Sequence, residues 1–225
     1  MTLKGRATAE GTEAYLSGPA PWIRPLGKTR LSVGAVGFGT YRLDQGDPGH
    51  EEALRVVLRG QRVNLIDTAC NYTGGQSEAL IGRVVAKEVA AGRVQRDGLV
   101  FVTKAGYLTD ELLEAAKQGS VPGGSISKLG SDHWHSFHPT VLDAAIPQSL
   151  ARLGLECIDV FLLHNPEYFL SSRQDQALEP LRKDFYGRIT EAFACLEKWV
   201  ASGAIGAYGI SSNTLGFPSD DPTST

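Results

Sequence analysis

The 225-residue sequence lacks several features that would place it in a specialised class. It has no apolar run near the roughly 20 residues that a membrane-spanning helix needs, and its N-terminus has no apolar signal-peptide core. Its net charge of −3 provides no positive field for nucleic acid or an anionic membrane. Its three cysteines are an odd number without metal-site spacing, which indicates reduced thiols. These absences predict a soluble, cytoplasmic protein without a nucleic-acid or membrane partner.

The sequence does contain an ordinary globular composition, 42% hydrophobic and 21% charged, in alternating strand-like and helix-like segments. Five nearly continuous apolar runs are expected to be strands, at 34–41, 64–69, 99–106, 157–164 and 204–212. Helices are expected at 51–61, 77–90 with Ser77 as N-cap, 139–153 with a kink at Pro147, and 190–201. We expect a loose leader over residues 1–22, then one domain over 23–225 that opens with a hairpin at 22–33.

Strands and helices in alternation predict an α/β fold with a parallel sheet, either doubly wound or closed as a barrel. A doubly wound dinucleotide domain needs the motif GxGxxG after its first strand, and Tyr41 and Arg42 break that pattern. The sequence therefore favours the (β/α)8 TIM-barrel type, with only about five of the eight β/α units in this chain.

Ionisable residues end three consecutive strand runs, namely Asp67, Lys104 and His164. Alone, each is readily explained as a structural ion pair or cap, but in a barrel these strand ends converge on one mouth. Tyr72 follows Asp67 after a short loop. Because an ammonium lowers the pKa of a neighbouring phenol, such a group of residues can polarise and protonate a carbonyl oxygen. A nicotinamide would have to supply the hydride.

These residues lie in segments that resemble the aldo-keto reductases: RPLGKTRLSVGAVGFGTYRL, NLIDTACNYTGGQSEALIG, FVTKAG, SLARLGLECIDVFLLHNPE and GAIGAYGISSN. The resemblance implies a (β/α)8 barrel and NADPH as cofactor, with NADH as the alternative. It also implies that an aldehyde or ketone is interconverted with an alcohol. Its catalytic tetrad falls on Asp67, Tyr72, Lys104 and His164, with Tyr72 as the general acid.

The resemblance also assigns residues around the tetrad. The cofactor-binding residues it implies are Gly39, Thr40, Tyr41, Asp67, Ser211, Ser212 and Asn213, of which the last three lie where a Ser-Asn pair binds the carboxamide. Trp134, in a loop over the mouth, is a candidate substrate contact. Thr73 stands where the family often has glycine, which we expect to alter only the loop.

Other interpretations remain at this stage. His133, His135 and His138 do not make a metal site, because they lie in an expected loop without a carboxylate or thiol partner, so no metal is predicted. Cys70 lacks an adjacent base and is interpreted as packing. The chain could instead be a nicotinamide-binding regulatory protein like the channel β-subunits, or an inactive truncated fragment. A five-strand sheet would expose two edges, which favours self-association.

Overall fold

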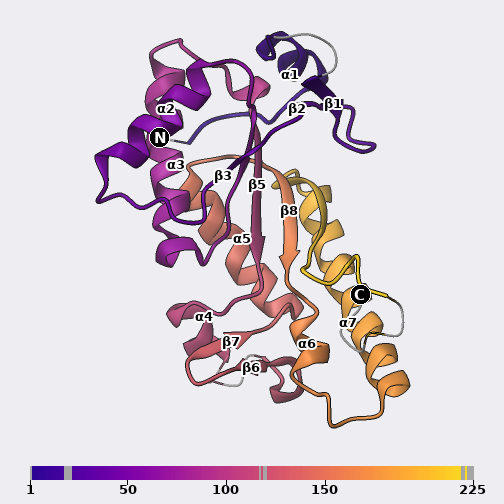
Figure 1. The fold of residues 1–225 in the computed structure, drawn as a ribbon. Coiled ribbons are helices and arrows are strands. Elements are labelled where there is room, and N and C mark those ends of the chain that lie inside the picture. The colour runs from indigo at the N-terminus through magenta and orange to yellow at the C-terminus, as the bar shows by residue number, and fades with distance from the viewer. Residues whose placement is uncertain (1, 18–21, 117, 119–120, 219–220, 222–225) are drawn as a thin grey trace.

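A computed structural model describes residues 2–17, 22–116, 118, 121–218 and 221. Its centre is a parallel sheet of five strands that follow one another in chain order (Figure 1). The strands are β3 (Phe38–Gly39), β4 (Leu65–Asp67), β5 (Val100–Ala105), β8 (Ile158–His164) and β9 (Ile205–Ser211). Every predicted strand run contributes a strand, so the expected α/β architecture is confirmed. In the described part of the sheet, β3 and β9 each have a single neighbour and form its two edges.

Four helices connect these strands: α2 (Pro48–Arg59), α3 (Gln76–Ala90), α5 (Pro139–Leu153) and α7 (Leu178–Ala201). Their apolar sides and the helix-facing side of the strands form one large core around Phe101, Phe161 and Leu142. The opposite side of the sheet carries a small separate cluster that includes Val33 and Val102. Within the described ranges, no helix is both long and apolar enough to cross a membrane.

The shorter elements lie at the two ends of the sheet (Figure 1). The predicted hairpin is present as β1 (Ile23–Pro25) and β2 (Ser32–Gly34). A second hairpin, β6 (Ser127–Leu129) and β7 (His133–His135), lies near the carboxyl ends of β5 and β8. The remaining short helices are α1 (Ala9–Tyr15), η2 (Tyr72–Gly75), η3 (Arg96–Gly98), α4 (Asp110–Ala115), η5 (Gly123–Ser125) and α6 (Tyr168–Ser171).

Two local predictions are wrong. Helix α3 begins at Gln76 after Gly75, whose φ of 85° is left-handed, so Ser77 lies inside the helix rather than at its N-cap. The buried hydroxyl of Ser77 donates to Thr40 instead. Residues 133–135 form strand β7 rather than a loop, because this segment pairs with β6 and its Trp134 carbonyl accepts from the Leu108 N–H.

Residues 2–17, part of the segment expected to be loose, are packed on the fold, whereas residues 1 and 18–21 of that segment lie outside the described ranges. The backbone of Leu3 exchanges hydrogen bonds with Gly154 and Glu156, and the Ala7 N–H donates to Asp159 Oδ1 over 2.7 Å. Helix α1 follows, with Thr8 as its N-cap, and the Tyr15 hydroxyl donates to Leu58. These partners are far away in sequence, so the composition of the segment did not reveal them.

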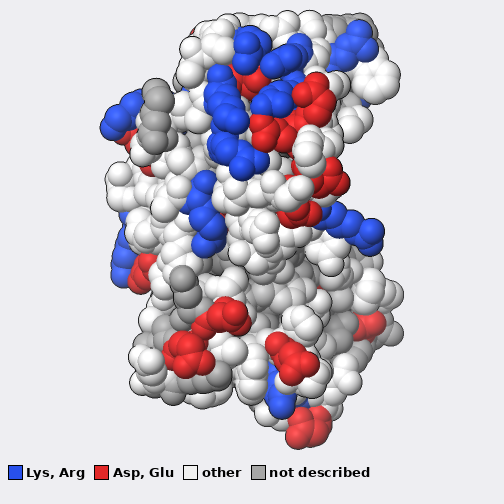
Figure 2. Space-filling view, turned by 90° about the vertical axis from the view of Figure 1, so that its left-hand side faces the viewer, with Lys and Arg blue, Asp and Glu red and all other residues white. Residues whose placement is uncertain are grey.

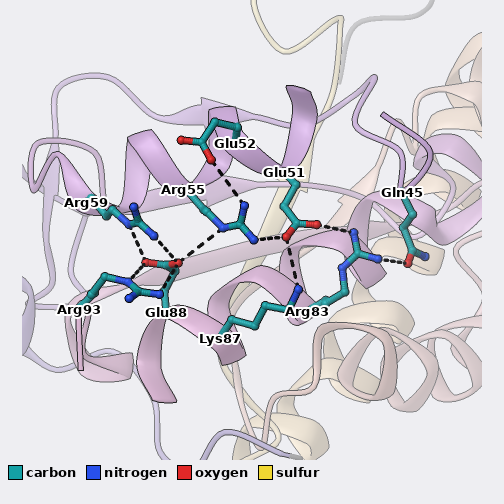
Figure 3. A network of polar contacts seen from close by, with 9 residues as sticks. All are labelled: Gln45, Glu51, Glu52, Arg55, Arg59, Arg83, Lys87, Glu88 and Arg93. Atoms are coloured by element: carbon teal, nitrogen blue, oxygen red, sulfur yellow. Dashed lines mark hydrogen bonds and ion pairs between the residues drawn. The ribbon is translucent and has the colours of Figure 1, made fainter. Parts of the chain in front are cut away.

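A buried carboxylate joins helices α2 and α3. The side chain of Glu88 is 0% exposed and accepts hydrogen bonds from Arg59 and Arg93, while Arg55 lies between it and Glu51 (Figure 3). On the molecular surface, basic and acidic side chains alternate over the upper part of the face that Figure 2 shows. The hydrogen bonds from the two guanidinium groups lower the pKa of Glu88 to about 2.

Glu88→Gln is expected to lower the free energy of unfolding by about 2–3 kcal/mol at pH 7, because it removes the charge that the arginines bind. The unfolded pKa of a glutamate is about 4.3. Because the folded pKa is lower, the stabilisation is complete above pH ~5 and is lost as the pH falls toward 2. Urea unfolding at pH 7, 5 and 3 measures it, with the exposed Glu52→Gln as control. An equal deficit at pH 7 and pH 3 would contradict the assignment.

Candidate active site

The structure brings Asp67, Tyr72 and Lys104 together at the carboxyl ends of β4 and β5. Lys104 Nζ lies 2.8 Å from Asp67 Oδ2 and 3.3 Å from Tyr72 Oη. It also donates to the Thr68 carbonyl over 2.7 Å. The Lys104 side chain is 5% exposed and that of Asp67 33%. The ion pair therefore holds a nearly buried ammonium against a phenol oxygen.

The loop after β4 explains how Tyr72 reaches this position. The Thr68 and Cys70 N–H groups donate to carbonyls of β5, which ties the start of the loop to the neighbouring strand. Thr73 then adopts φ 47°, in the left-handed region that favours glycine, and its hydroxyl donates to the Leu43 carbonyl over 2.6 Å. The threonine thus keeps a turn that glycine would make more easily, and adds a hydrogen bond.

His164 ends β8 on the other side of Tyr72. Its ring centroid lies 5.9 Å from that of Tyr72 and 5.0 Å from that of Tyr107, both in edge-to-face geometry. Burial, together with the nearby Lys104 ammonium, lowers the pKa of His164 to about 3. The imidazole is therefore neutral at pH 7. It can hydrogen-bond a carbonyl oxygen without itself being an acid.

Strand register places the predicted cofactor residues beside this group. Gly39 pairs with Asp67, and Ser211 pairs with His164. The carboxyl ends of β3 and β9 therefore lie on either side of the strands that lead to the predicted catalytic tetrad. The Thr40 hydroxyl donates to the Asp67 carbonyl over 2.9 Å. Tyr41 is 66% exposed, with its ring 5.1 Å from the Tyr72 ring. The roles of these residues remain predictions.

The loop after β9 is held in place by hydrogen bonds to a side chain in the loop after β8. The Asn213 N–H donates to Glu167 Oε1 over 3.0 Å, and the same oxygen accepts from the Asn165 side chain. The hydroxyls of Ser212 and Thr214 lie 3.2 Å apart. Ser211, Ser212 and Asn213 thus form an ordered tip next to His164.

Trp134 lies on β7 and lines a cleft of about 680 Å³ with Tyr107, Cys70 and Asn71. The cleft is also lined by Arg152 of α5, which places it on the helix side of the strand ends. Tyr107 borders both the cleft and the His164 ring. The role of Trp134 as a substrate contact remains a prediction.

The three histidines of the HWHSFH segment point to different surroundings. His133 is exposed, His135 is 1% exposed, and the His138 side chain caps α5 by accepting from the Thr140 N–H. Burial raises the pKa of the Cys70 thiol to about 12, which keeps it protonated. Among the described residues, no three metal-ligating side chains are grouped as a metal site.

Sequence reasoning missed Tyr107 and His135 as neighbours of His164. Tyr107 is separated from the end of β5, the strand that carries Lys104, by Gly106 alone. This short distance in sequence was the signal that could have identified it. His135 had no such signal, since its place depends on a hairpin that is held by hydrogen bonds to Gly106 and Leu108, more than 25 residues earlier in the chain.

Comparison with known proteins gives consistent matches. The model of the aldo/keto reductase family matches residues 31–216. The NADH-specific methylglyoxal reductase of Escherichia coli is 27% identical over 82% of this chain and 50% of its own length. The NAD(P)H-dependent D-xylose reductase of Scheffersomyces stipitis is 28% identical over 79% of this chain and 48% of its own length. This chain therefore spans about half the length of these curated relatives.

Solved structures give the same picture of the fold. An aldo-keto reductase from Bacillus halodurans, in its holo form, superposes with a TM-score of 0.59 at 23% identity. The match covers 85% of this chain and 50% of that one. The described fold thus corresponds to about half the length of an aldo-keto reductase structure, and its five-stranded sheet to part of that barrel.

Proposed function

Because the chain belongs to the aldo/keto reductase family, we propose that it carries the catalytic residues of an NAD(P)(H)-dependent oxidoreductase. The reaction interconverts an aldehyde or ketone and an alcohol, with a small carbonyl compound as substrate. The observation that carries this proposal is the contact of the Lys104 ammonium with both Tyr72 Oη and Asp67. An ammonium held against a phenol oxygen stabilises the phenolate that forms when the phenol gives its proton to a carbonyl oxygen.

Each of the four side chains has a proposed task. Tyr72 gives its proton to the carbonyl oxygen during reduction and takes it back during oxidation. Lys104 stabilises the phenolate that remains, and Asp67 holds Lys104 in place. Neutral His164, with its ring 5.9 Å from that of Tyr72, donates a hydrogen bond that orients the carbonyl oxygen.

The tip of β3 fits a nicotinamide, which supplies the hydride when bound. A Cβ at Gly39 would meet no atom within 4 Å, so there is open space beside Asp67. Tyr41 presents an exposed ring next to Tyr72, on which a flat heterocycle can stack. Asn213, at the tip of β9, has an amide side chain suited to a carboxamide. We propose NADPH as the cofactor, NADH as the alternative, and the cytoplasm as the location.

A nicotinamide-binding regulatory protein is the second candidate. It requires the same open space beside Gly39 but no proton donor. The 3.3 Å contact between Lys104 and Tyr72 favours the enzyme, because binding alone does not need an ammonium there.

The test is aldehyde reduction by two forms of the protein. The first is the 225-residue chain, and the second is a complete barrel made by joining this chain to the C-terminal half of the NAD(P)H-dependent D-xylose reductase. We expect the complete barrel to oxidise NADPH in the presence of an aldehyde. The chain alone should not exceed background, because it covers 48% of that relative's length.

NADPH and NADH are compared at equal concentration, and quenching of tryptophan fluorescence reports binding. Binding without turnover in the complete barrel would favour the regulatory protein. A chain that turns over alone would show that half of the barrel suffices. Size exclusion of the chain alone also tests the self-association expected from its sheet edges.

A further inference from the structure

His135 is a nearly buried histidine outside the four proposed catalytic side chains. It is 1% exposed, and its Nε2 lies 2.6 Å from the backbone carbonyl oxygen of His164. A carbonyl only accepts, so His135 Nε2 carries the proton and donates. Burial lowers the pKa of His135 to about 4, and the ring is neutral at pH 7.

The approach of His135 to His164 depends on Gly106. A Cβ at residue 106 would lie 2.3 Å from the His164 carbonyl oxygen and 2.6 Å from His135 Nε2. Any side chain there would force the two histidines apart. The segment after β5 also holds the hairpin in place, since the Ser136 N–H donates to the Gly106 carbonyl over 2.8 Å.

Aromatic rings that pack against His135 also contact the side chain of His164. The His135 ring lies edge-on to Tyr107 and Tyr168, at centroid distances of 5.6 and 5.4 Å. Tyr107 in turn lies 5.0 Å from the His164 ring and donates to the Tyr168 hydroxyl over 3.0 Å. His164 is therefore held through its backbone by His135 and through its ring by a tyrosine that packs on His135.

We propose that His135 is a positioning residue for His164, fixing the end of β8 so that the imidazole stays beside Tyr72. This inference rests on the proposed function, in which His164 orients the carbonyl oxygen. The hairpin β6–β7 is then part of the catalytic architecture, although none of the four proposed catalytic side chains lies on it.

Two amide variants isolate the hydrogen bond. In His135→Gln, the amide nitrogen can take the place of Nε2 and still donate to the His164 carbonyl. In His135→Asn, the shorter amide corresponds to Nδ1 and does not reach. Both are polar and uncharged, so they differ mainly in this contact. His138→Asn, which retains an N-cap side chain for α5, is the control for changing a neighbouring histidine.

Two readouts are compared. In the complete barrel, His135→Asn should lower kcat for aldehyde reduction about tenfold, whereas His135→Gln should stay within about threefold of wild type. In the 225-residue chain, 15N spectra of the histidine rings should show the His164 signals displaced in His135→Asn and near their wild-type positions in His135→Gln and His138→Asn.

The proposal is overturned by wild-type kcat and unmoved His164 signals in His135→Asn, or by equal losses in both amide variants. It is also overturned if circular dichroism shows that His135→Asn loses its fold while His135→Gln retains it, since the contact would then be structural. The ring spectra do not depend on turnover. A wild-type barrel without activity therefore refutes the proposed function, while the spectra still test whether His135 positions His164.

Discussion

Replacing Tyr72 with phenylalanine is expected to lower carbonyl reduction in the complete barrel by a factor on the order of 10² or more. The substitution removes only the hydroxyl that Lys104 Nζ contacts at 3.3 Å. The ring remains between Tyr41 and His164, so the shape of the site is retained. Steady-state kinetics with one aldehyde measure the loss. Cofactor affinity, followed by fluorescence quenching, should hardly change.

The control for this experiment is Tyr186→Phe, which removes a hydroxyl from an exposed tyrosine of α7. It should leave turnover at the wild-type rate. If Tyr72→Phe also turned over at the wild-type rate, another group would have to be the proton donor.

Lys104→Met should reduce turnover by a factor on the order of 10²–10³, because it removes the charge that stabilises a developing phenolate. Methionine keeps most of the side-chain volume in a position that is 4% exposed, so packing changes little. The variant also leaves the Asp67 carboxylate without its 2.8 Å partner. Kinetics and thermal unfolding measured together separate loss of activity from loss of fold.

Chemical rescue sharpens this second prediction. In Lys104→Ala, a small primary ammonium such as ethylammonium can occupy the space that the side chain leaves. Added ethylamine should restore part of the activity, whereas an equal concentration of sodium chloride should not. A rate that does not respond to the amine, in a folded variant, would make Lys104 a structural cation.

The sequence predicted the strand ends well, for a physical reason. Residues 64–69, 99–106 and 157–164 are buried or half-buried throughout, so their apolar runs are nearly continuous, and a charged residue at the end of such a run is conspicuous. Asp67, Lys104 and His164 were found in this way, and the structure brings the first two within hydrogen-bonding distance. The catalytic roles remain to be tested.

What the sequence did not reveal depends on distant pairing. The hairpin β6–β7 lies in a glycine- and serine-rich segment with weak local preference, and its contacts with residues 106–108 hold it in place. The N-terminal segment is similar, because its hydrogen bonds go to residues 154–159. Hydrogen bonds to such distant residues leave no periodic pattern in the local sequence. His135 was therefore predicted to lie in a loop, and the residues of α1 were predicted to belong to a loose leader.

The packing of the N-terminal segment also concerns the order in which a ribosome delivers the chain. The bonds of Lys4 to Glu156 and of Ala7 to Asp159 each join residues 152 positions apart. At a synthesis rate of ~5–20 residues per second, Lys4 and Ala7 are made roughly 8–30 seconds before their partners. The segment that holds Lys4 and Ala7 therefore cannot complete its packing until Asp159 has been made. A purification tag fused to it would lie beside the start of β8 instead of on a free tail.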